Sequence, residues 1–303
     1  MTNPQDPATL AYANLQPEQI FGALETLGYL CDGRFLALNS YENRVYQVGL
    51  EDEAPVVVKF YRPGRWSDAA IVEEHDFAWE LADAELPVVA PLVHDGDSLH
   101  RQGDFRFAVY PRRGGRAPDL DNLDLLDQIG RLIGRIHLVG ETAEFDARPS
   151  IDIESYGIRS CDYLLESDFI PRELRPAYES VADLVIDGVE ACYERAGAVM
   201  ELRLHADFHP GNVLVNQDQV HIVDLDDTRH GPAVQDLWMF LSGDQAEQAP
   251  QLAALLDGYE IFRRFDAREL HLIEALRSLR IMHYAAWLAR RWDDPAFKVA
   301  FPW

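Results

Sequence analysis

Short runs of apolar residues, separated by polar turns, cover most of the first third of the chain. β-Branched and aromatic residues dominate these runs, as is typical of strands. The predicted strands cover residues 35–38, 44–48, 56–60, 86–93 and 105–110. Two other stretches, residues 17–30 and 68–83, repeat an apolar residue every three or four positions, which predicts amphipathic helices. We therefore expect the first part of the chain to combine a sheet with helices.

Residues 111–116, with the sequence Pro-Arg-Arg-Gly-Gly-Arg, interrupt every periodicity and indicate a linker. The pattern beyond this linker is mainly helical, over residues 125–139, 174–195 and 251–292. One exception is a pair of short apolar runs, residues 213–215 and 220–225, which predicts an antiparallel hairpin. These patterns predict an α+β, bilobal fold with a β-rich domain at residues 1–110 and a mostly helical domain at residues 111–303.

The composition excludes several classes of partner. With 48% hydrophobic residues among 303, the chain can bury a large core. The 52 acidic residues outnumber the 27 basic ones, and the formal charge of −25 repels nucleic acids and anionic membranes. Cys31, Cys161 and Cys192 are widely spaced and form no C-x-x-C pair, which indicates a reducing compartment and no structural metal.

No targeting or membrane-spanning segment is recognisable in the sequence. The first 19 residues have neither a basic region nor an apolar core, so they do not resemble a signal peptide. No apolar run approaches the roughly 18–20 residues that a bilayer crossing requires. We expect a soluble cytoplasmic protein and a monomer, although the sequence does not identify the oligomeric state.

Asp207 and Asn212 have four residues between them, as do the Asp and Asn of the catalytic loop of protein kinases. Folding the predicted hairpin at Asp218 sets Asn212 opposite Asp224, close enough for both to bind one Mg²⁺ ion. We expect Asp207 to position an acceptor hydroxyl and take its proton, and Asn212 and Asp224 to bind Mg²⁺ on the phosphates of a nucleotide. This motif predicts a phosphoryl-transfer site.

Lys59 is the one cation in the apolar run Val56–Phe60, an arrangement similar to the V-A-I-K strand of protein kinases. In the helix predicted at residues 68–83, Glu74 shares the inward apolar stripe, whereas Glu73 falls nearer the opposite face. A carboxylate on an apolar stripe needs a charged partner. We expect a Lys59–Glu74 pair that orients Lys59 toward the phosphates of ATP, with Glu73 as the alternative partner.

The loop between the first two predicted strands, residues 39–44, contains no glycine. A glycine-rich phosphate loop is therefore absent from the sequence. Small polar residues also permit tight turns, so backbone N–H groups and the Ser40 hydroxyl are the candidates for covering the phosphates.

Other polar residues near these motifs have more ordinary interpretations. Asp226 and Asp227 are expected to be solvated or to cap a turn rather than to bind a second ion. His205 and His209 have no third soft ligand at a suitable spacing, which favours structural hydrogen bonds over a Zn²⁺ site. Asp236 opens a helix and is expected to support the catalytic loop from behind. Three arginines of the linker could bind a substrate anion, but the default expectation is that they are solvated: Arg112, Arg113 and Arg116.

Five segments, spread over nearly the whole chain, resemble one family of enzymes. They are residues 39–47, 57–63, 73–77, 223–239 and 285–297. Together with the loop from His205 to Asn212, they resemble the aminoglycoside phosphotransferase/choline kinase group. The resemblance is closest to the bacterial stress response kinase A family of cytoplasmic serine/threonine protein kinases. That family extends beyond the position of Trp303, so the sequence leaves open whether the C-terminus is complete.

The resemblance implies a protein-kinase-like fold and transfer of phosphate from ATP to Ser or Thr hydroxyls of proteins, this chain among them, in a stress response. It implies that Asp207 and Asp224 are active-site residues and that Asn212 and Asp224 bind Mg²⁺. Ser40 would lie at the ATP site. ATP is then the co-substrate and a protein is the partner, with no role for nucleic acid or membrane.

Two other functions remain open. A small-molecule kinase of the aminoglycoside, choline or homoserine kinase type has the same fold and uses the same residues. The acidic composition suits a small cationic substrate as well as a basic protein segment. A nucleotide-binding pseudokinase that acts as a scaffold agrees less well with the sequence, because Lys59, Asp207, Asn212 and Asp224 are all present.

Overall fold

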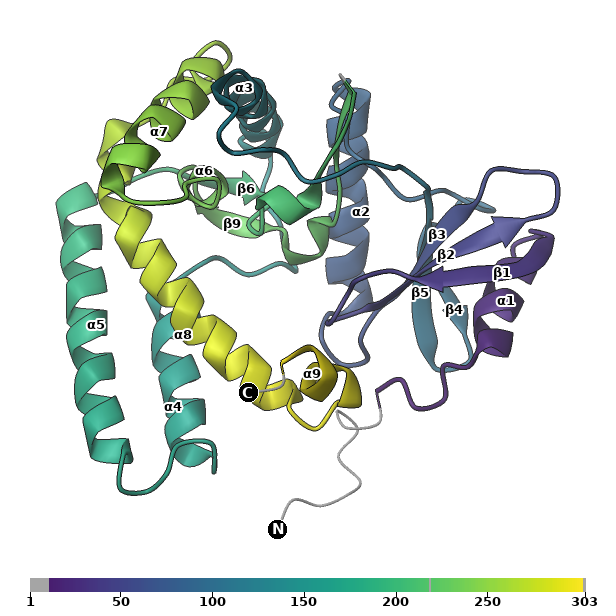
Figure 1. Cartoon of the computed structure of the whole chain (residues 1–303), viewed down its shortest axis with the longest axis horizontal. Coiled ribbons are helices and arrows are strands. Elements are labelled where there is room, and N and C mark those ends of the chain that lie inside the picture. The colour runs from purple at the N-terminus through teal and green to yellow at the C-terminus, as the bar shows by residue number, and fades with distance from the viewer. Residues whose placement is uncertain (1–10, 218, 302–303) are drawn as a thin grey trace. The chain divides into compact units, whose positions relative to one another are not determined.

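The computed structural model describes residues 11–217 and 219–301 (Figure 1), and these form two compact units. The first unit contains the described residues up to Gly115, together with Asn216–Asp226 and the described residues from Arg291 onward. The second unit contains Arg116–Val215 and Asp227–Arg290. By this grouping the β-rich unit takes in two segments from the second half of the chain. The division predicted between residues 110 and 111 stays a prediction.

The first unit is built on a five-stranded antiparallel sheet with the strand order β1-β2-β3-β5-β4. The strands are β1 (Cys31–Ala37), β2 (Arg44–Leu50), β3 (Val56–Phe60), β4 (His100–Gln102) and β5 (Phe105–Pro111). The central strand β3 lies between β2 and β5 with Lys59 opposite Val45 and Ala108. Val58 and Phe60 alternate with Lys59 and are fully buried in the core of this unit.

Among the described residues of the first unit, the helices are α1 (Pro17–Glu25), α2 (Asp68–Asp83) and α9 (Pro295–Ala300). Helix α2 has the bounds that the apolar period predicts. Ser67 caps its first turn, since its side chain accepts a hydrogen bond from the Ala70 N–H at 3.1 Å.

The prediction of a strand at residues 86–93 is wrong. Only a single bridge, between Val88 and Ile222, forms there. Pro87 and Pro91 lack the N–H groups that a continuous ladder requires, so the segment makes isolated hydrogen bonds instead.

The second unit is mainly helical, as the 3.6-residue period predicts. Its helices are α3 (Leu123–Gly140), α4 (Arg159–Glu166), α5 (Arg175–Ala196), α6 (Gln235–Trp238), α7 (Gln245–Tyr259) and α8 (Ile273–Arg291), with a π-helical turn at Glu154–Ile158 and 3₁₀ turns at Pro210–Asn212 and Ala267–Leu272. Two strands, β6 (Glu201–Leu204) and β9 (Arg229–Pro232), form a short antiparallel sheet. The predicted hairpin is present as β7 (Val213–Asn216) and β8 (Gln219–Ile222), and the boundary between the units falls within it, since β8 belongs to the first unit. The α+β class is confirmed.

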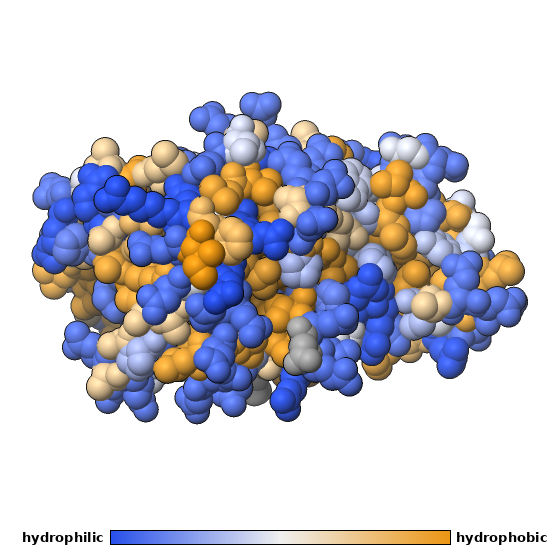
Figure 2. Space-filling view, turned by 90° about the horizontal axis from the view of Figure 1, so that it is seen from above, coloured by the Kyte–Doolittle hydropathy of each residue, from blue (hydrophilic) through white to orange (hydrophobic). Residues whose placement is uncertain are grey.

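None of the helices in residues 11–217 and 219–301 combines the length and the apolar composition that a membrane crossing requires. On the face shown in Figure 2, hydrophilic residues are spread over the whole surface with hydrophobic residues between them.

Helices α3 and α7 lie side by side (Figure 1) and approach so closely that their backbones touch. A Cβ atom built at Gly130 in α3 would overlap with the carbonyl oxygen of Leu255 in α7. A Cβ atom at Gly258 in α7 would in turn overlap with the carbonyl oxygen of Asp127 in α3. Glycine at these two positions permits a contact that any side chain would prevent.

We predict that Gly130→Ala lowers the free energy of unfolding by about 1–3 kcal/mol, because the added methyl group must push the two helices apart. Gly188→Ala in α5 is the matched control, since nothing lies within 4 Å of the added atom. It should be neutral or stabilise by up to about 1 kcal/mol, through the better helix propensity of alanine. Urea unfolding measures both changes, and equal effects of the two substitutions would contradict the packing argument.

Candidate active site

The loop that contains Asp207 is fixed by a buried carboxylate behind it. Asp236, in α6, is completely buried and accepts hydrogen bonds from the His205 N–H at 2.9 Å and the Ala206 N–H at 2.8 Å. The Gln235 side chain donates to the Ala206 carbonyl oxygen at 2.7 Å. Ala206 has a φ of 67°, a left-handed conformation that is unfavourable for alanine. These hydrogen bonds maintain that conformation, and Asp236 supports the loop as expected.

The supporting carboxylate is itself fixed from two sides. The imidazole of His137 in α3 lies 3.2 Å from the Asp236 carboxylate through Nε2 and 3.0 Å from the Tyr259 hydroxyl through Nδ1. Burial lowers the pKa of His137, although its bond to Asp236 acts in the opposite direction. At the start of α6, the Val234 N–H donates to the Glu269 carboxylate at 2.8 Å. The loop that contains Asp207 therefore depends on a chain of buried polar contacts in the second unit.

Asp207 itself is paired with two basic side chains. Its Oδ1 lies 2.7 Å from Nη2 of Arg280, in α8, and its Oδ2 lies 3.5 Å from Nε2 of His209. Burial by itself raises the pKa of Asp207, but the bond from His209 and the Arg280 guanidinium bring it below the usual value. The carboxylate is therefore kept ionised, which is the form that can accept a proton.

The side chain of Asn212 is buried and contacts the backbone of Asp207. Its side-chain nitrogen Nδ2 donates to the Asp207 carbonyl oxygen at 2.9 Å. Because the amide nitrogen is engaged, the amide oxygen is the atom of Asn212 that remains to bind a cation.

The two histidines of this loop have structural contacts. The His205 ring is buried and stacks on Phe208 with ring centroids 4.8 Å apart. His209 Nδ1 accepts the Gly211 N–H at 2.9 Å. Within the part of the chain that the structure describes, no group of three or more His, Cys, Asp or Glu is arranged to hold a metal.

In the first unit, Lys59 is buried among three carboxylates. Its Nζ lies 3.1 Å from Glu74 Oε1, 3.2 Å from Asp224 Oδ1 and 3.1 Å from Asp226 Oδ1. Burial by itself lowers the pKa of Lys59, but Asp226, Glu74 and Asp224 outweigh it, so the pKa lies well above the usual value. Of the two neighbouring glutamates, the structure brings Glu74 to Lys59.

Asp226 differs from expectation. We expected a solvated or capping residue, but Asp226 is buried and pairs with both Lys59 and Arg65. Asp226 can be buried because the ammonium group of the buried Lys59 stabilises its carboxylate. No local pattern indicates this, because Arg65 is 161 positions away in the chain.

Asp224 lies just after a strand rather than in one. Strand β8 ends at Ile222, so the strand predicted to continue through Leu225 is too long. Asp224 has a φ of 63°, and a 3₁₀ turn follows at Leu225–Asp227, so the chain leaves the extended conformation here. Aspartate tolerates this left-handed region better than most residues. Its side chain is 52% exposed and available to a ligand.

Ser40 lies in the loop between β1 and β2, as predicted. The Ser40 hydroxyl donates to the Asn43 carbonyl oxygen at 3.2 Å, which closes a tight turn without glycine. The three linker arginines are exposed: Arg112, Arg113 and Arg116.

The predicted site residues are distributed over both units. Ser40, Lys59, Glu74 and Asp224 belong to the first unit. Asp207 and Asn212 belong to the second unit, so the Mg²⁺ ion shared by Asn212 and Asp224 stays a prediction. The turn predicted at Asp218 lies outside the described residues.

The sequence did not predict the contact of Arg280 with Asp207. Arg280 comes from α8, far along the chain from the loop that it contacts. Nothing in its local sequence distinguishes it from a solvated helix arginine.

The family model described as "Phosphotransferase enzyme family" matches residues 34–273. The chain belongs to the phosphotransferase enzyme family. Within it, the chain is 45% identical to "Stress response kinase A" of Escherichia coli (strain K12) over 98% of its own length and 89% of the relative. It is 44% identical to "Serine/threonine protein kinase RdoA" of Salmonella typhimurium (strain LT2) over 96% and 88% of the two chains. The family resemblance predicted from the sequence is confirmed.

Solved structures of lower identity show the fold. Amicoumacin kinase hAmiN has a TM-score of 0.74 at 21% identity, covering 89% of this chain and 85% of its own. A microcompartment-associated aminopropanol kinase has a TM-score of 0.69 at 20% identity, covering 89% of each chain. The kinase-like fold is confirmed, and the chain is a phosphotransferase.

The buried carboxyl of Glu269 makes stability depend on pH. Burial raises its pKa to about 7 from the usual 4.5. A raised carboxyl pKa means that the folded protein binds the proton more tightly than the unfolded chain. The contribution to stability is therefore complete below about pH 4.5 and is lost as the pH rises through 7.

We predict that Glu269→Gln, which cannot ionise, gains stability relative to the wild type by about 3 kcal/mol between pH 4.5 and pH 8. Urea unfolding at a series of pH values measures this difference. Glu260→Gln, at an exposed position at the end of α7, controls for the loss of one negative charge. A difference between Glu269→Gln and the wild type that does not change with pH would exclude Glu269 as the titrating group.

Proposed function

We propose that this protein transfers the γ-phosphoryl group of ATP to Ser or Thr hydroxyls of proteins, in a Mg²⁺-dependent reaction in the bacterial cytoplasm during stress. The observation that carries the proposal is the relative at 44% identity over 96% of the chain whose name is a serine/threonine protein kinase. The name of the Escherichia coli relative adds the connection to stress.

On the acceptor side, Asp207 is the catalytic residue. Its ionised carboxylate orients the attacking hydroxyl and accepts its proton as the new phosphorus–oxygen bond forms. Asp236 supports this role, since it fixes the backbone that leads into Asp207. Arg280 and His209 restrict the rotation of the carboxylate.

On the nucleotide side, Lys59 binds the α- and β-phosphates. Glu74, together with Asp226, orients the ammonium group at the end of this flexible side chain. The turn at Ser40 lies at the start of β2, which is paired with the strand that carries Lys59. Backbone N–H groups of this turn and the Ser40 hydroxyl cover the phosphates in the proposed complex.

The chemistry of Asn212 and Asp224 supports the proposed Mg²⁺ ion. Asn212 has its amide oxygen available, and the exposed carboxylate of Asp224 supplies a second hard oxygen ligand. Two protein ligands suffice for Mg²⁺, because water and substrate phosphates complete its coordination. When bound, the ion neutralises the charge of the phosphates.

A small-molecule kinase is the second candidate. The solved structures that share the fold include enzymes named for amicoumacin, aminopropanol and choline. The formal charge of −25 also suits a cationic acceptor.

We predict that Asp207→Asn lowers the rate of phosphoryl transfer by at least about 100-fold, because the acceptor loses its base, while Mg·ATP still binds. Asp224→Ala should instead abolish Mg²⁺-dependent nucleotide binding. Labelled ATP measures transfer, and calorimetric titration measures binding. Asp187→Asn, at an exposed position of α5, is the control and should change neither. Transfer by Asp207→Asn within a few-fold of the wild type would remove Asp207 from its role.

The acceptor is tested with labelled ATP and the purified wild type. With the wild type, we expect label on Ser or Thr of the protein itself or of a generic basic protein. When the Asp207→Asn variant replaces the wild type, we expect no label. A panel of amino alcohols, sugars and aminoglycosides is tested in parallel. Rapid turnover of one small molecule with no label on any protein would favour the second candidate.

A further inference from the structure

The loop between β1 and β2 receives contacts from both ends of the described chain. We call residues 39–43 the β1–β2 loop. From the N-terminal side, the Tyr12 hydroxyl lies 3.2 Å from the Glu42 carbonyl oxygen and 3.1 Å from the Phe60 carbonyl oxygen. The Arg44 guanidinium, directly after the loop, lies 4.4 Å from the centroid of the Tyr12 ring. The β1–β2 loop is therefore attached to the segment that precedes α1.

The C-terminal segment contributes a buried carboxylate. Asp294 is buried, and its carboxylate accepts hydrogen bonds from Arg44 Nη2 at 3.0 Å and from Arg62 Nη2 at 2.7 Å. It also caps α9, because its Oδ1 accepts the Ala296 N–H at 3.0 Å. One carboxylate thus connects the start of α9 to Arg44, the first residue of β2, and to Arg62, just after β3.

A second ionic contact reaches the β1–β2 loop itself. The Glu42 carboxylate lies 2.5 Å from Nε of Arg291 and 3.0 Å from Nε of Arg62. Arg62 also uses its backbone N–H, which donates to the Asn43 side-chain oxygen at 3.1 Å. Glu42 and Asn43 are therefore fixed, through polar atoms of their side chains, by residues outside the loop.

Aromatic packing completes the contact. The Tyr41 ring lies 5.3 Å from the Phe301 ring and 6.4 Å from the Phe297 ring, measured between centroids. Phe297 is fully buried, and the Arg62 guanidinium lies 5.7 Å from its centroid. The apolar and ionic contacts thus act on adjacent residues of the same loop.

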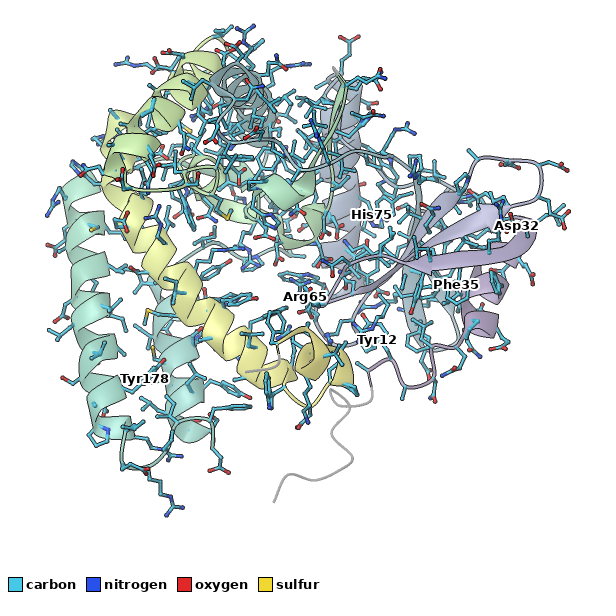
Figure 3. All side chains as sticks on the ribbon, viewed as in Figure 1. Tyr12, Asp32, Phe35, Arg65, His75 and Tyr178 are labelled. Atoms are coloured by element: carbon cyan, nitrogen blue, oxygen red, sulfur yellow. The ribbon has the colours of Figure 1, made fainter. Side chains whose placement is uncertain are left out.

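This cluster continues to the proposed ATP site. Arg65 pairs with Asp226, which is a partner of Lys59, and its Nε lies 3.8 Å from the Glu42 carboxylate. Figure 3 labels Arg65 and Tyr12 of this cluster. The residues that fix the β1–β2 loop are therefore connected through charged contacts to the lysine that would bind phosphate.

We propose that Asp294 is a positioning residue for the nucleotide, which acts by fixing the β1–β2 loop through Arg44 and Arg62. The inference rests on the ATP site proposed above in the first unit. A glycine-rich loop can approach phosphates because its backbone is unobstructed. The β1–β2 loop has Tyr41, Glu42 and Asn43 instead, and contacts with other segments hold these side chains in place. A loop that is ordered before ATP binds loses less entropy on binding.

The test compares two adjacent aspartates. Asp294→Asn removes the charge that Arg44 and Arg62 contact, whereas Asp293→Asn changes a side chain that is 59% exposed. For Asp294→Asn we expect the KM for ATP to rise about tenfold, with less than a twofold change in kcat at saturating ATP. Hydrogen exchange of residues 39–44 should also become faster. Asp293→Asn should match the wild type in both measurements.

A second variant covers the case in which Asp294→Asn does not fold. Tyr41→Leu removes the ring contacts with Phe297 and Phe301 and leaves the Asp294 ion pairs intact. It should also raise the KM for ATP and speed exchange in residues 39–44. A folded variant with the wild-type KM for ATP and wild-type exchange would overturn the inference.

The failure of the proposed function is a separate result. If the wild type neither binds nor uses ATP, the proposed function is wrong and the exchange measurement alone decides whether Asp294 fixes the loop. Faster exchange in Asp294→Asn or Tyr41→Leu than in Asp293→Asn then supports the structural part of the inference, and equal exchange overturns it.

Discussion

The ammonium group of Lys59 is buried, and the carboxylates that neutralise it determine how the first unit is assembled. Glu74 comes from α2 and Asp226 from the turn after β8, so one lysine joins the sheet, a helix and a segment from the second half of the chain. Breaking such a buried pair leaves an uncompensated charge, which is strongly unfavourable. Arg65 offsets part of the excess of negative charge through Asp226. The position of Asp224 beside Lys59 follows from this arrangement.

In the second unit, the buried carboxylate of Asp236 fixes the backbone around it. Asp236 satisfies two backbone N–H groups that would otherwise be buried without partners, and in doing so it sustains the left-handed conformation of Ala206. That conformation sets the direction in which the chain enters Asp207. Glu269 fixes the first turn of α6, and His137 contacts Asp236 from α3. The geometry of the loop that contains Asp207 therefore depends on residues outside that loop.

Elements with strong local signals could be predicted closely. Strand β3 and helix α2 have the predicted bounds, because an apolar β-branched run and a helical period with a serine cap are local properties. The segment at residues 86–93 has the apolar composition of a strand, but its two prolines remove the donors that pairing requires. The end of β8 was misplaced because the left-handed φ of Asp224 depends on contacts that its sequence neighbours do not reveal.

The sequence by itself determined the family, the fold class and the chemical groups of the candidate site, since the spacing of Asp207 and Asn212 and the run around Lys59 are short-range patterns. Only the tertiary structure decided the partners of those groups. Arg44 and Asp294 are 250 positions apart, and neither Arg280 nor Asp226 differs in its local sequence from a solvated charge. The physical reason is that the strength of an ion pair depends on burial, and burial is decided by which distant segments pack together.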